Sequence, residues 1–327
     1  MRSLALSFAT VLLLCSGYAN ASEDLLQLAK QYFQPLPATM PGSELDTSEK
    51  IQLGKRLYFE TALSANHSQS CNSCHDLTGL RAGADDLPTS FGALGSRGLR
   101  NSPTTWNAGL QFVQFWDGRA ATLEEQARSP ILNPTEMALS SEQEAMQRLE
   151  SAGYRPSFET AFGGHDTPFS FANILSALAA FQRTLISEDR FDQFLEGQAN
   201  ALTSQEKQGL EKFIRTGCNA CHNGPLLGGN SFMKLGIAIP YPNQSDTGRA
   251  QVTGKVGDKF FFKVPPLRNV GLTAPYFHDG ASATLEKTIF DTGIHQLGIK
   301  LQDKDVADIA AFLRSLDNFK EPLKIQE

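Results

Sequence analysis

The sequence predicts a mainly α-helical protein built from two similar halves. A short run, CNSCH at 71–75, recurs almost unchanged as CNACH at 218–222. A second run, AAFQRTL at 179–185, reappears as AAFLRSL at 310–316. Between these segments glycine and proline are frequent, whereas the alternation of apolar and polar residues that is typical of strands is scarce. These observations indicate a duplicated helical fold with long connecting loops.

The chain begins with the pattern of an export signal. An apolar stretch, Leu4–Leu14, follows a short positive start, and Ala19-Asn20-Ala21 provides an A-x-A cleavage site. This pattern predicts a signal peptide over residues 1–21. No later segment reaches the roughly 18 uninterrupted apolar residues that a membrane-spanning helix needs. We therefore expect that the mature protein is not an integral membrane protein.

An amphipathic helix is predicted before each CxxCH run, at residues 48–59 and at residues 203–214. The second of these helices opens with Thr203 and Glu206, which form the capping-box pattern of a helix start. The stretch 224–258 is the richest in loop residues, and we expect a few short strands in it.

The CxxCH run is the attachment signature of a c-type haem. Two thiols add to the two vinyl groups of one porphyrin, and the His that follows is placed to ligate the iron. A disulfide or half of a zinc site is the alternative for one such run. Two runs, each with its His, and no other cysteine in the mature chain favour two covalently bound haems. Their attachment residues are Cys71, Cys74, Cys218 and Cys221, and their iron ligands are His75 and His222.

The two halves each resemble a small cytochrome c. In that fold the helix before the haem motif packs across a helix near the end of the domain, and the AAF runs have that place here. We therefore predict a domain at 22–189 and a second at 190–327, each with one haem. Covalent haem attachment takes place outside the cytoplasm, which agrees with export to the periplasm.

The composition excludes some classes of partner. The formal net charge is −6, which argues against binding to nucleic acid and to an anionic membrane surface. It does not argue against a protein redox partner, because a local patch of charge matters more for such a contact.

The segments between the CxxCH runs carry a closer resemblance. FWDGR at 115–119 is followed by Gln126 and by PILNPTEM at 130–137. Further runs are RNSPT at 100–104, PLRNV at 266–270, TAPYFHDG at 273–280 and QLG at 296–298. With these motifs the chain resembles the bacterial dihaem cytochrome c peroxidases, in the superfamily that also contains the MauG-like enzymes.

The resemblance implies a function for each domain. The N-terminal domain would be peroxidatic and the C-terminal domain would transfer electrons to it. Hydrogen peroxide would be reduced to water in the periplasm with electrons from a small cytochrome c or a cupredoxin. A homodimer is also common in the family.

Glu136, Gln126 and Trp116 are the candidate catalytic residues. In the family a Gln and a Glu ten residues apart stand over the peroxidatic haem, and Gln126 and Glu136 have that spacing. Cleavage of a peroxide O–O bond needs a base that takes a proton and returns it to the leaving oxygen, and a buried carboxylate can do both. The alternative makes Glu136 a helix-start residue after Pro134. Trp116 matches the family's tryptophan between the haems, or is a packing aromatic beside Phe115.

The resemblance also implies a calcium ion between the domains. Its ligands in the family are an Asn side chain in the RNxPT run and backbone carbonyls of the TAP run. These positions are Asn101, Thr273 and Pro275 here. Oxygen ligands of this kind suit a hard cation.

Two positions depart from the family pattern. In many members a loop His seven residues before the Arg of RNxPT blocks the peroxidatic iron, and this position is Ala93 here. The usual Met ligand of the second haem stands four residues before QLG, and this position is Thr292. The first departure predicts a peroxidatic iron that is open without prior reduction. The second leaves the sixth ligand of the second haem undecided between His295, Met233, His278 and no ligand.

Two other functions stay open. A MauG-like enzyme would use its two haems to oxidise residues of a partner protein. The absence of the usual Met ligand and of the loop His keeps this alternative open. A non-catalytic dihaem electron carrier is the third, although Glu136 and Gln126 would then have no reason to occur together. The intact NPTEM segment at 133–137 favours the peroxidase.

Overall fold

The computed structural model describes residues 23–79, 81–164 and 166–318. The predicted signal peptide at 1–21 lies outside the described residues. Within the described part of the chain, no helix is both long enough and apolar enough to cross a membrane.

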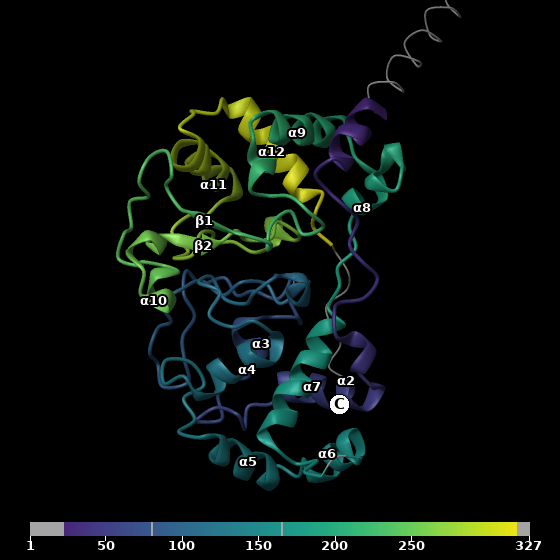
Figure 1. The fold of residues 1–327 in the computed structure, drawn as a ribbon, viewed down its shortest axis with the longest axis vertical. Helices are drawn as coiled ribbons and strands as arrows, with labels where there is room; N and C mark the ends of the chain where they lie inside the picture. Colours follow the sequence, from purple (N-terminus) through teal and green to yellow (C-terminus); the bar gives the residue numbers. More distant parts are fainter. Residues whose placement is uncertain (1–22, 80, 165, 319–327) are drawn as a thin grey trace, which may run out of the picture.

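The molecule consists of two halves stacked along its long axis (Figure 1). The first half contains η1 (Ser43–Leu45), α2 (Ser48–Tyr58), α3 (Cys71–Cys74), η2 (Ala108–Leu110), α4 (Leu123–Leu132), α5 (Glu142–Ser151), α6 (Arg155–Phe162) and α7 (Phe171–Arg183). The second contains α8 (Arg190–Leu195), η3 (Ala199–Ala201), α9 (Ser204–Arg215), η4 (Cys218–Ala220), β1 (Phe232–Lys234), α10 (Ala250–Thr253), η5 (Val256–Asp258), β2 (Phe261–Lys263), η6 (Val270–Leu272), α11 (Leu285–Thr292), the π-helix η7 (Gly293–Leu297) and α12 (Asp303–Arg314). The prediction of a mainly α-helical protein is confirmed.

The two predicted helices before the CxxCH runs are present and begin at side-chain caps. The Thr47 hydroxyl accepts a hydrogen bond from the backbone N–H of Lys50 at the start of α2. Thr203 and Glu206 form the predicted capping box of α9. The expected short strands form an antiparallel pair, β1 with β2, and β1 lies inside the predicted stretch 224–258.

Each half contains one close crossing of two helices. In the first half α2 packs on α7, and in the second α9 packs on α12. A glycine makes each crossing possible. A Cβ atom at Gly54 would lie 1.8 Å from the carbonyl oxygen of Ala177, and one at Gly209 would lie 1.9 Å from that of Asp308. The same backbone approach therefore occurs twice, which is strong support for a duplicated fold.

A second repeat, which sequence reasoning missed, links residues 162 positions apart, as in FWDGRAATL at 115–123 and FHDGASATL at 277–285. Phe115 and Phe277 both have positive φ, 66° and 68°. An isolated bridge closes each loop, Gln114 with Ala120 and Tyr276 with Ser282. Thr122 and Thr284 then cap the helices α4 and α11. The repeat places Trp116 and His278 in equivalent positions.

Ser187 joins the two copies of this repeat. Asn107 and Asn269 are also 162 positions apart, and both have left-handed backbone conformations. Their side-chain amides donate to the same Ser187 hydroxyl, at 2.8 and 2.9 Å. The chain therefore passes from one half to the other at a buried polar contact that both halves share.

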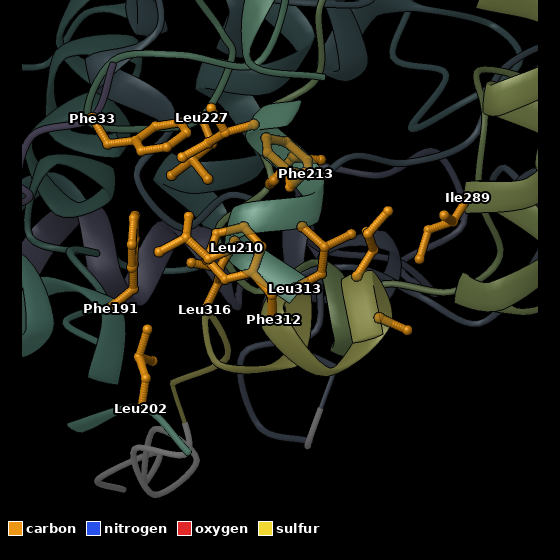
Figure 2. Close-up of a cluster of buried hydrophobic side chains, with 14 of the residues drawn as sticks. Phe33, Phe191, Leu202, Leu210, Phe213, Leu227, Ile289, Phe312, Leu313 and Leu316 are labelled. Atoms are coloured by element: carbon orange, nitrogen blue, oxygen red, sulfur yellow. The ribbon is translucent and has the colours of Figure 1, made fainter. Parts of the chain in front are cut away.

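The first described helix, at residues 23–30, packs on the second half of the molecule (Figure 1). Ala29 and the fully buried Phe33 lie in one hydrophobic cluster with Phe191, Phe213 and other residues of the second half (Figure 2). The predicted division at 189 stays a prediction, but this N-terminal segment does not follow it. No local pattern predicts this contact, because it joins residues far apart in the chain.

Arg268 holds the junction of these segments together. Its side chain is 0% exposed and forms ion pairs with Asp189 at 2.6 Å and Asp192 at 2.8 Å. The same guanidinium donates to the carbonyl oxygens of Pro225 at 2.9 Å and Gln34 at 3.4 Å. Burial raises the pKa of the Asp189 carboxyl, and the charge of Arg268 opposes this shift.

Candidate functional site

The first CxxCH run forms a short helix with its imidazole in a defined orientation. Cys71 and Cys74 lie at the two ends of α3, and His75 follows directly. The Nδ1 atom of His75 lies 2.9 Å from the carbonyl oxygen of Pro103. Because a carbonyl can only accept, Nδ1 carries the proton and Nε2 is left with the lone pair. A haem ligand is oriented in this way.

The second run repeats this arrangement. Cys218 and Cys221 flank the turn η4, with His222 next in the chain. The Nδ1 atom of His222 lies 3.0 Å from the carbonyl oxygen of Leu227. In both halves the imidazole is therefore held by a backbone carbonyl, although the partner residue lies at a different distance along the chain.

The donor atoms of both runs fit a covalently bound haem. All four cysteines of the described chain are free thiols. Burial raises the pKa of Cys71 to about 12, so this thiol stays protonated. Burial also lowers the pKa of His75 and of His222, which favours the neutral imidazole that iron requires. A pair of thiols followed by a neutral, oriented imidazole is the donor set of a c-type haem.

Glu136 lies beside the first CxxCH run. It belongs to the turn that follows α4, so the alternative of a helix start after Pro134 is wrong. The side-chain amide of Asn133 donates to Glu136 Oε1 at 2.7 Å. Burial raises the pKa of Glu136, while the Asn133 hydrogen bond and the charge of Arg119 oppose the shift. Burial raises the pKa of Cys74 to about 11, and the carboxylate of Glu136 contributes to that rise.

Gln126 stands on the helix that leads to this turn. Its side chain is half-buried on α4. No hydrogen bond joins it to Glu136 within the ranges that the structure describes, so its role as a partner of Glu136 stays a prediction.

The loop that contains Ala93 is docked on the turn of Glu136. The backbone N–H of Ala93 donates to the carbonyl oxygen of Glu136 at 2.7 Å. The side-chain amide of Asn66 donates to the carbonyl oxygen of Ala93 at 2.5 Å. A Cβ atom at Gly92 would lie 2.1 Å from the carbonyl oxygen of Thr135. The loop therefore reaches the candidate active site with its backbone, and position 93 presents only a methyl group there.

Trp116 lies where the two halves meet. Its indole Nε1 donates to the carbonyl oxygen of Asn101 at 2.9 Å, and its own carbonyl oxygen accepts from the backbone N–H of Lys263 at 2.7 Å. Lys263, which sequence reasoning missed, is 5% exposed. Its ammonium donates to the carbonyl oxygen of Val113 at 3.0 Å, and burial lowers its pKa to about 7. Trp116 is therefore held from both halves of the molecule.

Ion pairs close the same interface. Arg100 binds Asp117 at 2.5 Å within the first half and Asp246 of the second half at 2.6 Å. Arg249 donates to the carbonyl oxygens of Asp117 and Gly118, at 2.8 and 2.7 Å. These contacts fix the loop of Trp116 against the second half.

The candidate calcium residues lie on two neighbouring segments. Asn101 is buried, and its backbone N–H donates to the carbonyl oxygen of His278 at 2.8 Å. Thr273 and Pro275 precede His278 in the loop that Asn101 contacts. Within the described residues no group of three or more His, Cys, Asp or Glu side chains that could hold a metal occurs. The calcium site therefore stays a prediction.

The candidates for the sixth ligand of the second haem belong to three different segments of the chain. Met233 is in β1, opposite Phe262. His278 is 2% exposed, stacks on Phe262 at 4.3 Å, and neither of its ring nitrogens has a hydrogen-bond partner within the described chain. His295 is in the π-helix η7, with Nδ1 at 3.0 Å from the carbonyl oxygen of Ile239. Thr292 is the last residue of α11.

Three residues of the site were not predicted. Asn133 holds Glu136, Arg119 lowers its pKa, and Lys263 is buried beside Trp116. For Lys263 the available signal was the repeat at 162 positions, because this repeat pairs Lys263 with the candidate residue Asn101.

Comparisons with known proteins show the family to which this chain is related. Residues 48–200 match the family model described as di-haem cytochrome c peroxidase. The chain is 42% identical over 331 residues to the cytochrome c551 peroxidase of Pseudomonas aeruginosa, which covers 98% of this chain and 92% of the relative. It is 39% identical over 318 residues to the cytochrome c551 peroxidase of Nitrosomonas europaea, which covers 97% and 92%.

Further similarities extend to MauG. The chain is 32% identical over 321 residues to the methylamine utilization protein MauG of Methylorubrum extorquens, covering 92% of this chain and 89% of that one. The fold is similar to the crystal structure of a MauG-like protein associated with microbial copper homeostasis, with a TM-score of 0.78 and 31% identity, covering 89% and 95%.

Proposed function

This chain belongs to the di-haem cytochrome c peroxidase family, and on that premise we propose that it reduces hydrogen peroxide to water in the periplasm. Two electrons come from a small cytochrome c or a cupredoxin, and two protons complete the conversion of one peroxide to two waters. The observation that carries the proposal is Glu136, a half-buried carboxyl with a raised pKa held beside the first CxxCH run.

The two haems divide the reaction between the halves. Cys71, Cys74 and His75 hold the haem at which peroxide reacts, in the domain 22–189. Cys218, Cys221 and His222 hold the haem that receives electrons, in the domain 190–327. When bound, the haem irons supply the electron transfer and the binding of peroxide. A calcium ion at Asn101, Thr273 and Pro275 and a homodimer remain part of the proposal.

Glu136 moves the proton. Its carboxylate accepts a proton from one peroxide oxygen and returns it to the oxygen that leaves as water. The Asn133 amide donates to Oε1 at 2.7 Å, which leaves Oε2 to accept the proton. Gln126 supplies a hydrogen bond in the same pocket. Trp116, held from both halves, bridges the path of the electrons from the second haem to the first.

Turnover with an electron donor tests this function. We expect the purified dihaem protein to oxidise reduced cytochrome c or cupredoxin with two equivalents consumed per peroxide. Stopped-flow absorbance at the donor's band, with peroxide omitted as a control, measures this ratio. Peroxide consumption without donor oxidation, together with oxidised residues on an added partner protein, would instead favour the MauG-like function. No reaction with peroxide would favour the carrier.

The loop at Ala93 predicts that prior reduction is not needed. A methyl group has no lone pair for iron, and the backbone of Ala93 is engaged with Glu136 and Asn66. We expect a high-spin ferric signal from the first haem in electron paramagnetic resonance of the diferric protein, and a fast spectral change with one equivalent of peroxide. Two low-spin signals and no reaction until an electron is added would refute this prediction.

A further inference from the structure

We propose that His295 is the distal ligand of the second haem. This ligand closes the second haem iron to peroxide, whereas the iron of the first haem stays open. The proposal rests on the proposed function only in that a haem is attached at Cys218, Cys221 and His222. It assigns a ligand that the motif position Thr292 no longer supplies.

The internal repeat pairs His295 with Asn133, the residue that holds Glu136 beside the first CxxCH run. Asn133 and His295 are 162 positions apart, at the same distance beyond the capping residues Thr122 and Thr284 of α4 and α11. In the first half this position carries the amide that holds Glu136 in the pocket. The equivalent position in the second half carries an imidazole. The repeat position that carries an amide beside the acid–base group in one copy thus carries a metal-binding imidazole in the other.

The orientation of His295 is that of a prepared ligand. Its Nδ1 lies 3.0 Å from the carbonyl oxygen of Ile239, so Nδ1 donates and the lone pair is on Nε2. His75 and His222 are held in the same way, each by a backbone carbonyl at Nδ1. No hydrogen bond to Nε2 of His295 occurs within the described chain. Hydrogen bonding of the second ring nitrogen is the usual way in which a protein orients a metal-binding His.

The backbone around His295 is also anchored. The carbonyl oxygen of His295 accepts from the backbone N–H groups of Ala238 and Ile239, at 3.1 and 3.2 Å. Its ring meets the ring of Tyr241 edge to face at 5.7 Å. The residue lies in a π-helix. This conformation is rare in proteins, and where it occurs it is often found at a functional site. The loop at 238–241 therefore anchors both the backbone and the ring of His295, and none of these contacts uses Nε2.

The other candidates are placed differently. His278 is the repeat equivalent of Trp116, and its carbonyl oxygen binds Asn101 of the first half. Its ring packs on Phe262 and Tyr241, and within the described chain neither of its ring nitrogens is oriented by a carbonyl oxygen, in contrast to the imidazole of His295. Met233 is in the strand β1, outside the repeat that supplies the distal group in the first half.

The ligand explains why two haems on one fold behave differently. An imidazole on both faces closes the second iron to peroxide, so peroxide reacts at the first. It also lowers the reduction potential of the second haem relative to an imidazole–thioether pair. The second haem therefore transfers electrons without the high potential that a Met ligand gives.

Spectroscopy of ligand variants tests the proposal. We expect near-infrared magnetic circular dichroism of the wild-type diferric protein to show imidazole–imidazole ligation at one haem. His295→Ala should convert that low-spin signal to high spin in electron paramagnetic resonance, and added free imidazole should restore it. Met233→Leu is the matched control and should leave the signal unchanged. His295→Met should raise the potential of the second haem in a redox titration.

Three results would overturn the assignment. These are a low-spin second haem that persists in His295→Ala, a thioether band in the wild-type protein that Met233→Leu removes, and a high-spin second haem in the wild type. Even where a variant fails to fold, a thioether band or a high-spin second haem in the wild-type spectrum would contradict the assignment. None of these readouts requires peroxidase activity, so failure of the proposed function and failure of this assignment are distinguishable.

Discussion

Glu136→Gln is expected to bind both haems and to lose peroxidase turnover by about 10²- to 10⁴-fold, the range for removal of a positioned acid–base group. The Gln side chain keeps the size and one hydrogen-bond acceptor for Asn133, which binds Glu136 at 2.7 Å. It cannot accept the proton of the peroxide. The measurement is steady-state turnover with reduced donor, at equal haem content by absorbance.

The pH profile separates this chemistry from a structural effect. Burial raises the pKa of Glu136, and the base form is lost as the pH falls through that value. The wild-type rate should therefore fall on the acid side, and the variant should lack that limb. Glu150→Gln is the control, because this carboxylate is 47% exposed and pairs with Arg155 at the surface. Near-normal turnover of Glu136→Gln would move the acid–base role to another residue.

Arg268→Met is expected to lower the free energy of unfolding by about 3–5 kcal/mol, the usual cost of leaving buried charges without their partner. Both Asp189 and Asp192 lose their cation, and the carbonyl oxygens of Pro225 and Gln34 lose a donor. Met fills a similar volume, so the loss reports on charge and hydrogen bonding more than on a cavity. Urea unfolding followed by circular dichroism measures it.

Two further variants check the cause. Arg215→Met removes an ion pair with Glu211 in which the side chains are 69% and 47% exposed, and we expect a loss of about 0–1 kcal/mol. Adding Asp189→Asn and Asp192→Asn to Arg268→Met should recover part of the stability, because these changes remove the buried charges that lack a partner. Asn is still a good N-cap for α8, so the helix start is kept. A loss below about 1 kcal/mol in Arg268→Met would show that the buried charges are compensated in another way.

The sequence alone determined the parts of this protein that depend on neighbouring residues. The two CxxCH runs contain the thiols and the imidazole of each haem within five positions, so their chemistry is readable without a fold. The helix at 203–214 was predicted because its Thr203 cap and its apolar face are local signals, and α9 confirms it. The repeated AAF runs likewise predicted the second helix of each crossing.

The tertiary structure decided what depends on residues far apart in the chain. Phe33 packs into the second half because apolar burial has no preference for sequence neighbours. Arg268 reaches Asp189 across 79 positions, and Trp116 is held by Asn101 and Lys263 from opposite halves. Glu136 was predicted as a candidate, but its pKa depends on burial that only the packed chain creates. A local pattern fixes which groups are present, whereas their burial and charge environment arise from the packing of distant segments.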